Sequence, residues 1–150
     1  MKGYAGVYLR RNGAPLPPGC AGHVGWAFML DDGSYYYGPT ENQSGLPFVK
    51  PGDDNGWWGE RGDTNYMLQA FRARNYDAYK VCSVLNANPS NAEKTARYKA
   101  GCGYGFITDN CLDHVWDILS AYGIEGLPWR QNYPSPNDWV AQFNGEFHNL

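Results

Sequence analysis

The stretch from 104 to 123, YGFITDNCLDHVWDILSAYG, constrains the fold more than any other part of this chain. After Cys111, apolar residues recur at Leu112, Val115, Trp116, Leu119 and Tyr122. This spacing follows one face of an α-helix. Asp109 or Asn110 is a suitable N-cap, and Gly123 is a suitable helix terminator. The sequence therefore predicts an amphipathic helix that carries Cys111 in its first turn.

A cysteine in the first turn of a helix lies among backbone N–H groups that have no partner within the helix, at the positive end of the helix dipole. This environment favours an anion, so it lowers the pKa of a thiol and raises its nucleophilicity. The same N–H groups can bind the oxyanion of an acyl-transfer intermediate. Cys111 is therefore a candidate nucleophile, and it requires a general base nearby.

The length favours a single domain over residues 1–150. With the strands and helices placed below, we expect an α+β fold in which a small antiparallel sheet packs against the cysteine-bearing helix. Hydrophobic residues make up 43% of the 150 residues and charged residues only 18%, which excludes a disordered charged chain. The formal net charge of −3 gives no electrostatic basis for binding nucleic acid. No apolar run has the length of a Sec signal or of a membrane span. We therefore expect a cytoplasmic protein, with export as an effector by a dedicated system as the alternative.

Four cysteines are present, at positions 20, 82, 102 and 111. The missing signal favours reduced thiols, whereas an exported protein could form two disulfides. A zinc site built from Cys20-x-x-His23 with Cys102 or Cys111 lacks a second paired motif. We therefore expect neither a metal nor another cofactor.

Strands and helices can be placed along the rest of the chain. Residues 23–30 and 34–40 are rich in aromatic and branched side chains and flank Asp31-Asp32-Gly33, which predicts an antiparallel hairpin. Further strands are expected at 4–10 and 76–85. Helices are expected at 64–74, at 90–98 with Ser90 or Asn91 as the cap, and within 137–147. Glycines and prolines favour loops over 12–19 and 43–63.

Among the three histidines, His23 is the best candidate for the base. It begins the hairpin, and the end of a strand can hold an imidazole rigidly across a cleft from a helix terminus. His114 follows Cys111 by three positions on the same helix, which leaves little room for a substrate between them. We interpret His114 as a polar or partly exposed helix residue and His148 as a solvated side chain in the tail.

The residue that orients His23 depends on the length of the hairpin turn. A two-residue turn at Asp32-Gly33 places Asn42 opposite His23, and a three-residue turn places Glu41 there. Either side chain can accept a hydrogen bond from the imidazole N–H, so both alternatives stay open at this point.

Aromatic and polar residues near these groups are candidates for substrate binding. Trp57 and Trp58 lie in the long loop of 43–63, and a loop of that length in a small domain is often functional. The alternative interpretation is that the two tryptophans seal an edge of the core. Tyr104 and Asn110 precede Cys111 and are the other candidates, although Tyr104 is equally suited to the core.

The order of these features resembles the circularly permuted papain-like enzymes, which include NlpC-type cell-wall peptidases and lecithin–retinol acyltransferase-like enzymes. In that superfamily a histidine on an early strand precedes a cysteine that begins a later helix. The helix often opens with an Asn-Cys pair and carries a histidine shortly afterwards. The matching residues are His23, Asn110-Cys111 and, with one extra residue of spacing, His114. The resemblance covers about 23–42 and 104–123, and the second histidine of the acyltransferase branch has no counterpart.

The resemblance implies acyl transfer through a thioester on Cys111, with His23 as the base and Asn42 or Glu41 as its partner. We expect a cysteine hydrolase that cleaves an amide bond in a peptide or peptidoglycan-like substrate without a cofactor. The absence of a membrane anchor argues against a lipid acyltransferase. The alternatives are a thiol acyltransferase, and a peptide- or sugar-binding module in which Cys111 is inert.

Overall fold

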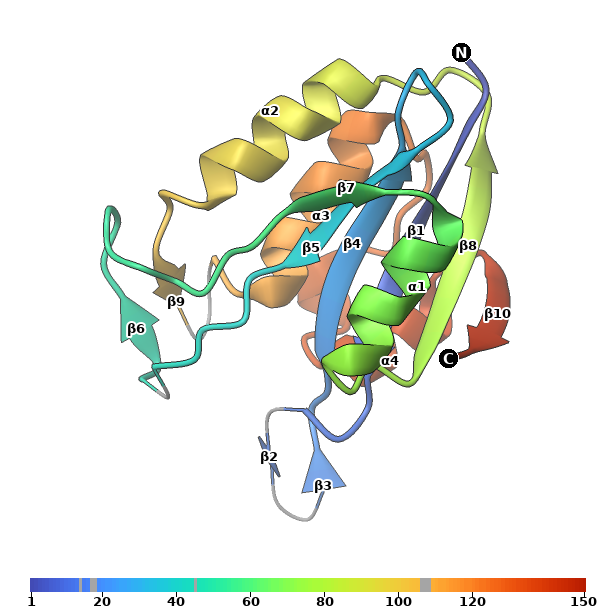
Figure 1. Ribbon diagram of the computed structural model, residues 1–150. Coiled ribbons are helices and arrows are strands. Elements are labelled where there is room, and N and C mark those ends of the chain that lie inside the picture. Colours follow the sequence, from blue (N-terminus) through green and yellow to red (C-terminus); the bar gives the residue numbers. More distant parts are fainter. Residues whose placement is uncertain (14, 17–18, 45, 106–108) are drawn as a thin grey trace.

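The computed structural model describes residues 1–150 except 14, 17–18, 45 and 106–108, together with the side chains of all described residues other than 15–16 and 19–20. The described residues form an α+β structure around a six-stranded antiparallel sheet with the order β10-β8-β1-β4-β5-β7 (Figure 1). This confirms the predicted α+β class and the antiparallel sheet. The strands of this sheet are β1 (Gly3–Arg10), β4 (His23–Met29), β5 (Tyr35–Pro39), β7 (Glu60–Gly62), β8 (Ala78–Val84) and β10 (Glu146–Asn149).

Two short strand pairs and the helices complete the described fold. The pairs are β2 (Pro15–Leu16) with β3 (Gly19–Cys20), and β6 (Phe48–Val49) with β9 (Tyr104–Gly105). The helices are α1 (Thr64–Ala73), α2 (Pro89–Lys99), α3 (Cys111–Tyr122) and α4 (Pro136–Gln142), with a 3₁₀ turn η1 at Arg130–Asn132.

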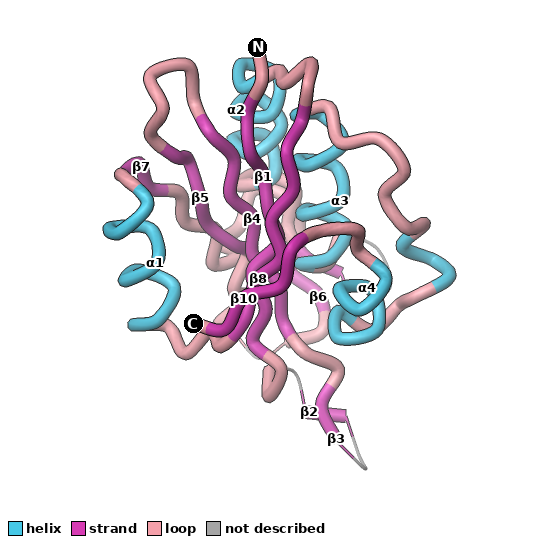
Figure 2. Tube along the Cα trace, turned by 90° about the vertical axis from the view of Figure 1, so that its right-hand side faces the viewer, coloured by secondary structure: helices cyan, strands magenta, loops and turns pink. Residues whose placement is uncertain are grey.

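Helices cover both faces of the sheet because successive side chains of a strand point to opposite faces. In β1, Val7 and Leu9 enter a core that includes residues of α2, α3 and α4, whereas Tyr8 packs with Phe71 of α1. Figure 2 shows α1 on one side of the sheet and α3 and α4 on the other. Burying one large apolar side chain such as Phe28 stabilises the fold by about 1.5–3 kcal/mol.

The predicted hairpin is present as β4 and β5, and its turn has three residues. Leu30 N–H donates to the Ser34 carbonyl at 2.7 Å, and Gly33 adopts the left-handed conformation with φ +85° that such turns require. Gly25 lies opposite Pro39 in this register. Two residues further on, the same register brings Glu41 opposite His23. The two-residue turn, which would have placed Asn42 there, is therefore wrong.

Helix α3 is anchored at both ends, and it fixes the position of Cys111 as its first residue. The Asn110 side chain accepts a hydrogen bond from the Asp113 N–H at 2.9 Å, and the Asp113 carboxylate accepts from the Asn110 N–H at 3.3 Å. This reciprocal capping satisfies two backbone donors of the first turn. Gly123 ends the helix at φ +114°, as predicted.

Several element boundaries differ from the predictions. Helix α2 is capped by Asn88 rather than by Ser90 or Asn91, because Pro89 has the fixed φ that suits the first helical position. The expected loop of 43–63 contains β6 and β7. The predicted helix within 137–147 ends at Gln142, and the chain then forms β10 along β8. The predicted loop of 12–19 and the stretch from 104 to 123 lie partly outside the described residues.

Candidate active site

Residues from α3, β4, β9 and the segment after β5 meet at the end of the sheet where the chain enters β4, the lower end in Figure 1. Cys111 begins α3 and is 5% exposed, and His23 begins β4 and is 6% exposed. Their side chains lie close enough together for each to shift the pKa of the other. Glu41 and Tyr104 contact the same pair. The structure therefore brings together four of the residues that the sequence singled out.

The contact between Cys111 and His23 shifts the pKa of each group. Burial by itself raises the pKa of the Cys111 thiol, but the charge of His23 and hydrogen bonding from its neighbours together outweigh burial and lower the pKa. Burial by itself lowers the pKa of His23, but the Cys111 charge, its hydrogen bond and the Glu41 charge together raise the pKa. These opposite shifts favour an ion pair of thiolate and imidazolium.

Two further donors point at the Cys111 sulfur. The backbone N–H of Val24 and the hydroxyl of Tyr104 both hydrogen-bond to it, and both lower the pKa of the thiol. The Tyr104 oxygen also lies beside the Cys111 backbone N–H, which opposes part of the rise in the pKa of Tyr104. Burial and the nearby sulfur raise the pKa of Tyr104, so its hydroxyl remains protonated. Tyr104 therefore lies against both the nucleophile and the N–H at the start of α3.

Glu41 supplies a buried carboxylate beside His23. Its side chain is 7% exposed, and its Oε2 lies 3.3 Å from His23 Nε2. This is an ion-pair distance, although the Nε2–H direction does not meet the geometry of a hydrogen bond. Arg10 donates to the same oxygen at 2.9 Å, and the Tyr76 hydroxyl donates to Oε1 at 3.1 Å. The carboxylate is thus held in place by two donors while it faces the imidazole.

Sequence reasoning missed Arg10 and Tyr76. Arg10 is the last residue of β1 and lies directly opposite His23 in the β1–β4 register. Tyr76 precedes β8, and its ring packs edge-on against His23 with the centroids 6.0 Å apart. Arg10 could have been suspected because it is a charged residue at the end of a predicted strand. Its contact with Glu41, however, depends on a strand register that no local sequence pattern defines.

Asn42 was the alternative partner of His23, and Asn110 was a candidate for substrate binding. Asn42 has a positive φ of 43°, its side-chain amide donates to the Leu46 carbonyl at 2.9 Å, and its oxygen accepts from the Ser44 hydroxyl at 2.8 Å. The side chain therefore closes a local turn. Asn110 caps α3 through Asp113, which positions Cys111 from one residue away.

Trp57 and Trp58 pack on opposite faces of the sheet, because neighbouring residues of an extended segment point in opposite directions. Trp57 packs against the core that contains Cys111. Trp58 packs with Tyr37 on the α1 face, where the Arg74 guanidinium lies 3.8 Å from the centre of its ring. Only Trp57 lies on the face that carries Cys111, so the two rings do not form one wall of a substrate cleft.

His114 is fully buried, which corrects the interpretation of a polar or partly exposed residue. Its Nδ1 lies 2.7 Å from the Thr40 hydroxyl oxygen. Burial and the nearby Lys99 charge lower the pKa of His114 to about 3, so the imidazole is neutral at physiological pH. The buried stripe of α3 is wider than the apolar pattern predicted, and it includes this position.

Comparison of the chain with protein-family models, curated proteins and solved structures finds no match. The geometry of the site therefore carries the functional argument. Over the residues that the structure describes, no helix is long and apolar enough to cross a bilayer. Over the same residues, no three His, Cys, Asp or Glu side chains gather in a way that could hold a metal ion.

Proposed function

We propose that this protein is a cysteine hydrolase of the circularly permuted papain-like type, which cleaves an amide bond in a peptide or peptidoglycan-like substrate. The observation that carries the proposal is the contact between the Cys111 thiol, at the first residue of α3, and the His23 imidazole, with the Glu41 carboxylate 3.3 Å from Nε2. A cysteine hydrolase requires a nucleophile in contact with a base, and a third group that orients the base. The chain order, with the histidine strand before the cysteine helix, supports the permuted type.

The first chemical step forms a thioester. The Cys111 thiolate attacks the carbonyl carbon of the amide, a C–S bond forms, and the carbonyl electron pair moves onto oxygen. The backbone N–H of Cys111 stabilises this oxyanion, assisted by the positive end of the helix dipole. When the intermediate collapses, the C–N bond breaks and the His23 imidazolium gives its proton to the departing amine.

The second step consumes water and regenerates the enzyme. Neutral His23 accepts a proton from water as the oxygen adds to the thioester carbonyl. Collapse of this second intermediate breaks the C–S bond and releases a carboxylic acid. Cys111 leaves as the thiolate and His23 carries the proton, which restores the starting ion pair. The balance of the two steps is amide plus water to acid plus amine.

Glu41 acts on both steps through His23. Its negative charge stabilises the imidazolium and so raises the pKa of His23. Since Nε2 faces Glu41, Nδ1 is the nitrogen left to exchange the proton with the sulfur and the leaving group. Arg10 and Tyr76 are positioning residues in this scheme, because they hold the carboxylate.

Substrate entry requires a local rearrangement. Cys111 is 5% exposed, and it lines neither of two cavities, of about 390 and 250 Å³, found elsewhere on the molecule. The Tyr104 hydroxyl lies beside the N–H that the oxyanion uses. A bound substrate therefore has to displace the Tyr104 hydroxyl from that N–H, and the hydroxyl can then donate to the same oxyanion.

The low exposure of Cys111 favours one alternative, a binding module in which the thiol is inert. Turnover separates the two functions. Purified peptidoglycan sacculi and denatured casein are incubated with the wild type, with Cys111→Ala and with the matched control Cys102→Ala, and new amino groups are measured with fluorescamine. The proposal predicts amine release by the wild type and by Cys102→Ala, and none by a folded Cys111→Ala. Equal release by Cys111→Ala would remove the mechanism, and binding without release by any variant would support the binding module.

A further inference from the structure

Strand β8 has an open edge beyond the end of β10. On that side β10 pairs with β8 only from Ala78 to Val81. On its other side β8 pairs with β1 along its whole length, up to Val84 opposite Gly3. Figure 1 shows the upper part of β8 running past β10 at the margin of the sheet.

The backbone of Ser83 faces this open edge. The Leu150 N–H donates to the Asp77 carbonyl at 3.1 Å, in line with the β10–β8 register. In an antiparallel strand, alternate residues direct both N–H and C=O to the same neighbour, so residues 79, 81 and 83 all turn to the β10 side. The pairing with β1 is continuous from 78 to 84, so no bulge interrupts the alternation. Among the described residues, none forms a backbone hydrogen bond with Ser83 on that side.

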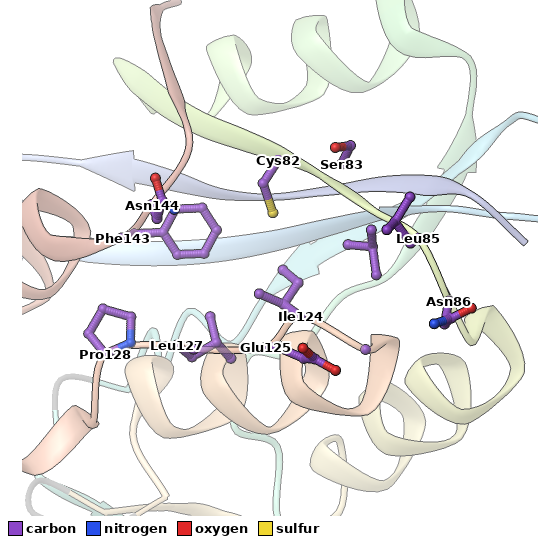
Figure 3. A pocket seen from close by; sticks show the side chains of 13 residues that line it. Cys82, Ser83, Leu85, Asn86, Ile124, Glu125, Leu127, Pro128, Phe143 and Asn144 are labelled. Carbon is purple, nitrogen blue, oxygen red and sulfur yellow. The ribbon is translucent and has the colours of Figure 1, made fainter.

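A cavity of about 390 Å³ lies directly beneath this edge, on the α3 face. Figure 3 shows Cys82 of β8, Ile124 and Leu127 of the segment after α3, and Phe143 after α4 pointing into it. These four side chains are apolar, and the lining also includes polar residues, among them Asn86 and Asn144. Glu125, which is exposed, is the one charged side chain among the residues that line the cavity.

The edge and the cavity are separate from the candidate active site. Gly123, at the end of α3, lines the cavity, whereas Cys111 begins the same helix. A helix of 12 residues is about 18 Å long. A ligand in the cavity therefore does not reach the sulfur of Cys111, and this inference does not depend on the proposed hydrolase.

We propose that this edge and cavity bind an extended segment of a partner protein by strand addition to β8. The Ser83 N–H and C=O pair with the backbone of the segment, and an apolar side chain of the segment enters the cavity. A basic residue of the segment lies beside Glu125, since no cation lines the cavity to oppose it. Because β10 covers residues 78–81 of β8, Ser83 is the outward-facing residue of the strand that is left for pairing, and the cavity and Glu125 supply the remaining contacts.

Cys82 provides the readout because it lies in the cavity as a free thiol, while Cys102 is free and lies outside it. The probe is the peptide acetyl-Lys-Val-Thr-Val-Thr-Val-amide, and its backbone N-methylated form is the matched control peptide. Alkylation of each cysteine by iodoacetamide is followed by mass spectrometry at pH 9, since burial raises the pKa of the Cys82 thiol. We expect millimolar peptide to slow alkylation of Cys82 at least fivefold and to leave Cys102 unchanged, whereas the N-methylated peptide protects neither.

Variants test the backbone pairing separately from the cavity. Ser83→Pro removes the outward N–H and should abolish protection of Cys82, whereas Ser83→Ala keeps the N–H and should preserve it. Glu125→Gln is a second variant that leaves the strand intact, and it should weaken protection by the lysine-containing peptide several-fold. Absence of protection in the wild type would overturn the proposal. Protection by the N-methylated peptide would overturn it as well, and so would dimerisation that shields Cys82 without any peptide.

Discussion

Replacement of Glu41 by glutamine tests the polar network around His23. Glu41→Gln keeps the shape of the side chain but removes the charge that faces Arg10 at 2.9 Å and His23 at 3.3 Å. A hydrogen bond to a charged group contributes about 1.5–3 kcal/mol. Arg10 is 27% exposed, so water compensates part of its loss, and the glutamine oxygen retains one acceptor. We therefore expect the free energy of unfolding to fall by about 1–3 kcal/mol. Each kcal/mol lowers the Tm of a chain of this size by about 2–4 °C.

The same substitution has a defined pH dependence. Glu41 is one of the groups that raise the pKa of His23 in the folded protein, so Glu41→Gln lowers that pKa. A base with a raised pKa stabilises the folded state below its unfolded pKa, and this contribution disappears as pH rises through the folded pKa. The difference in unfolding free energy between the wild type and Glu41→Gln should therefore be largest in mildly acidic solution. It should shrink as pH rises and His23 loses its proton.

Urea unfolding at several pH values measures the stability, and NMR titration of the imidazole protons measures the pKa of His23. Asn42→Gly is the matched control, because it removes the side chain that a two-residue turn would have placed at His23 and it tolerates the positive φ. The control should leave the pKa of His23 unchanged. An unchanged stability and an unchanged His23 pKa in Glu41→Gln, or an equal pKa shift in Asn42→Gly, would refute the reasoning.

Three further substitutions have defined outcomes. Gly123→Ala forces a side chain into a left-handed position and should lower the free energy of unfolding in urea by about 1–2 kcal/mol. Gly101→Ala should change it little, because the added Cβ meets only the Tyr98 carbonyl oxygen, at an ordinary contact distance of 3.8 Å. Tyr104→Phe removes a hydrogen bond to the Cys111 sulfur, so the pKa of Cys111 should rise and thiol alkylation should shift to higher pH. The pKa of His114 is about 3 in the folded protein and about 6.5 in the unfolded chain. The unfolded chain therefore binds a proton there first as pH falls below about 6.5, and the folded protein loses stability. His114→Gln should therefore flatten this acid limb in urea titrations at pH 7, 5 and 4.

The elements around the site were predictable because their signals are local. The apolar spacing of α3, the cap at Asn110 and the glycine at position 123 lie within one stretch of the chain. The hairpin was equally local, but Asp31-Asp32-Gly33 is compatible with two turn lengths. The choice between Glu41 and Asn42 therefore needed the observed register.

Features that depend on distant pairing were not predictable. Arg10 reaches Glu41 across the β4 strand, and Tyr76 approaches it from the start of β8, so both contacts follow from the strand order. The opposite directions of Trp57 and Trp58 follow from an extended segment in what was expected to be a loop. A hydrophobicity pattern counts His114 as polar, although its neutral imidazole lies in the core beside Thr40.

The ion pair of Cys111 and His23 is the central claim, and the pH dependence of thiol alkylation tests it most directly. Iodoacetamide rates for Cys111, Cys82 and Cys102 are measured by mass spectrometry, each relative to its own maximum at high pH, which cancels differences in exposure. An ordinary thiol with a pKa of about 8.5 is about 0.3% ionised at pH 6. We predict that Cys111 retains a much larger fraction of its maximal rate at pH 6, and that His23→Gln removes this advantage. A Cys111 profile that coincides with that of Cys102, or one that His23→Gln leaves unchanged, would contradict the account.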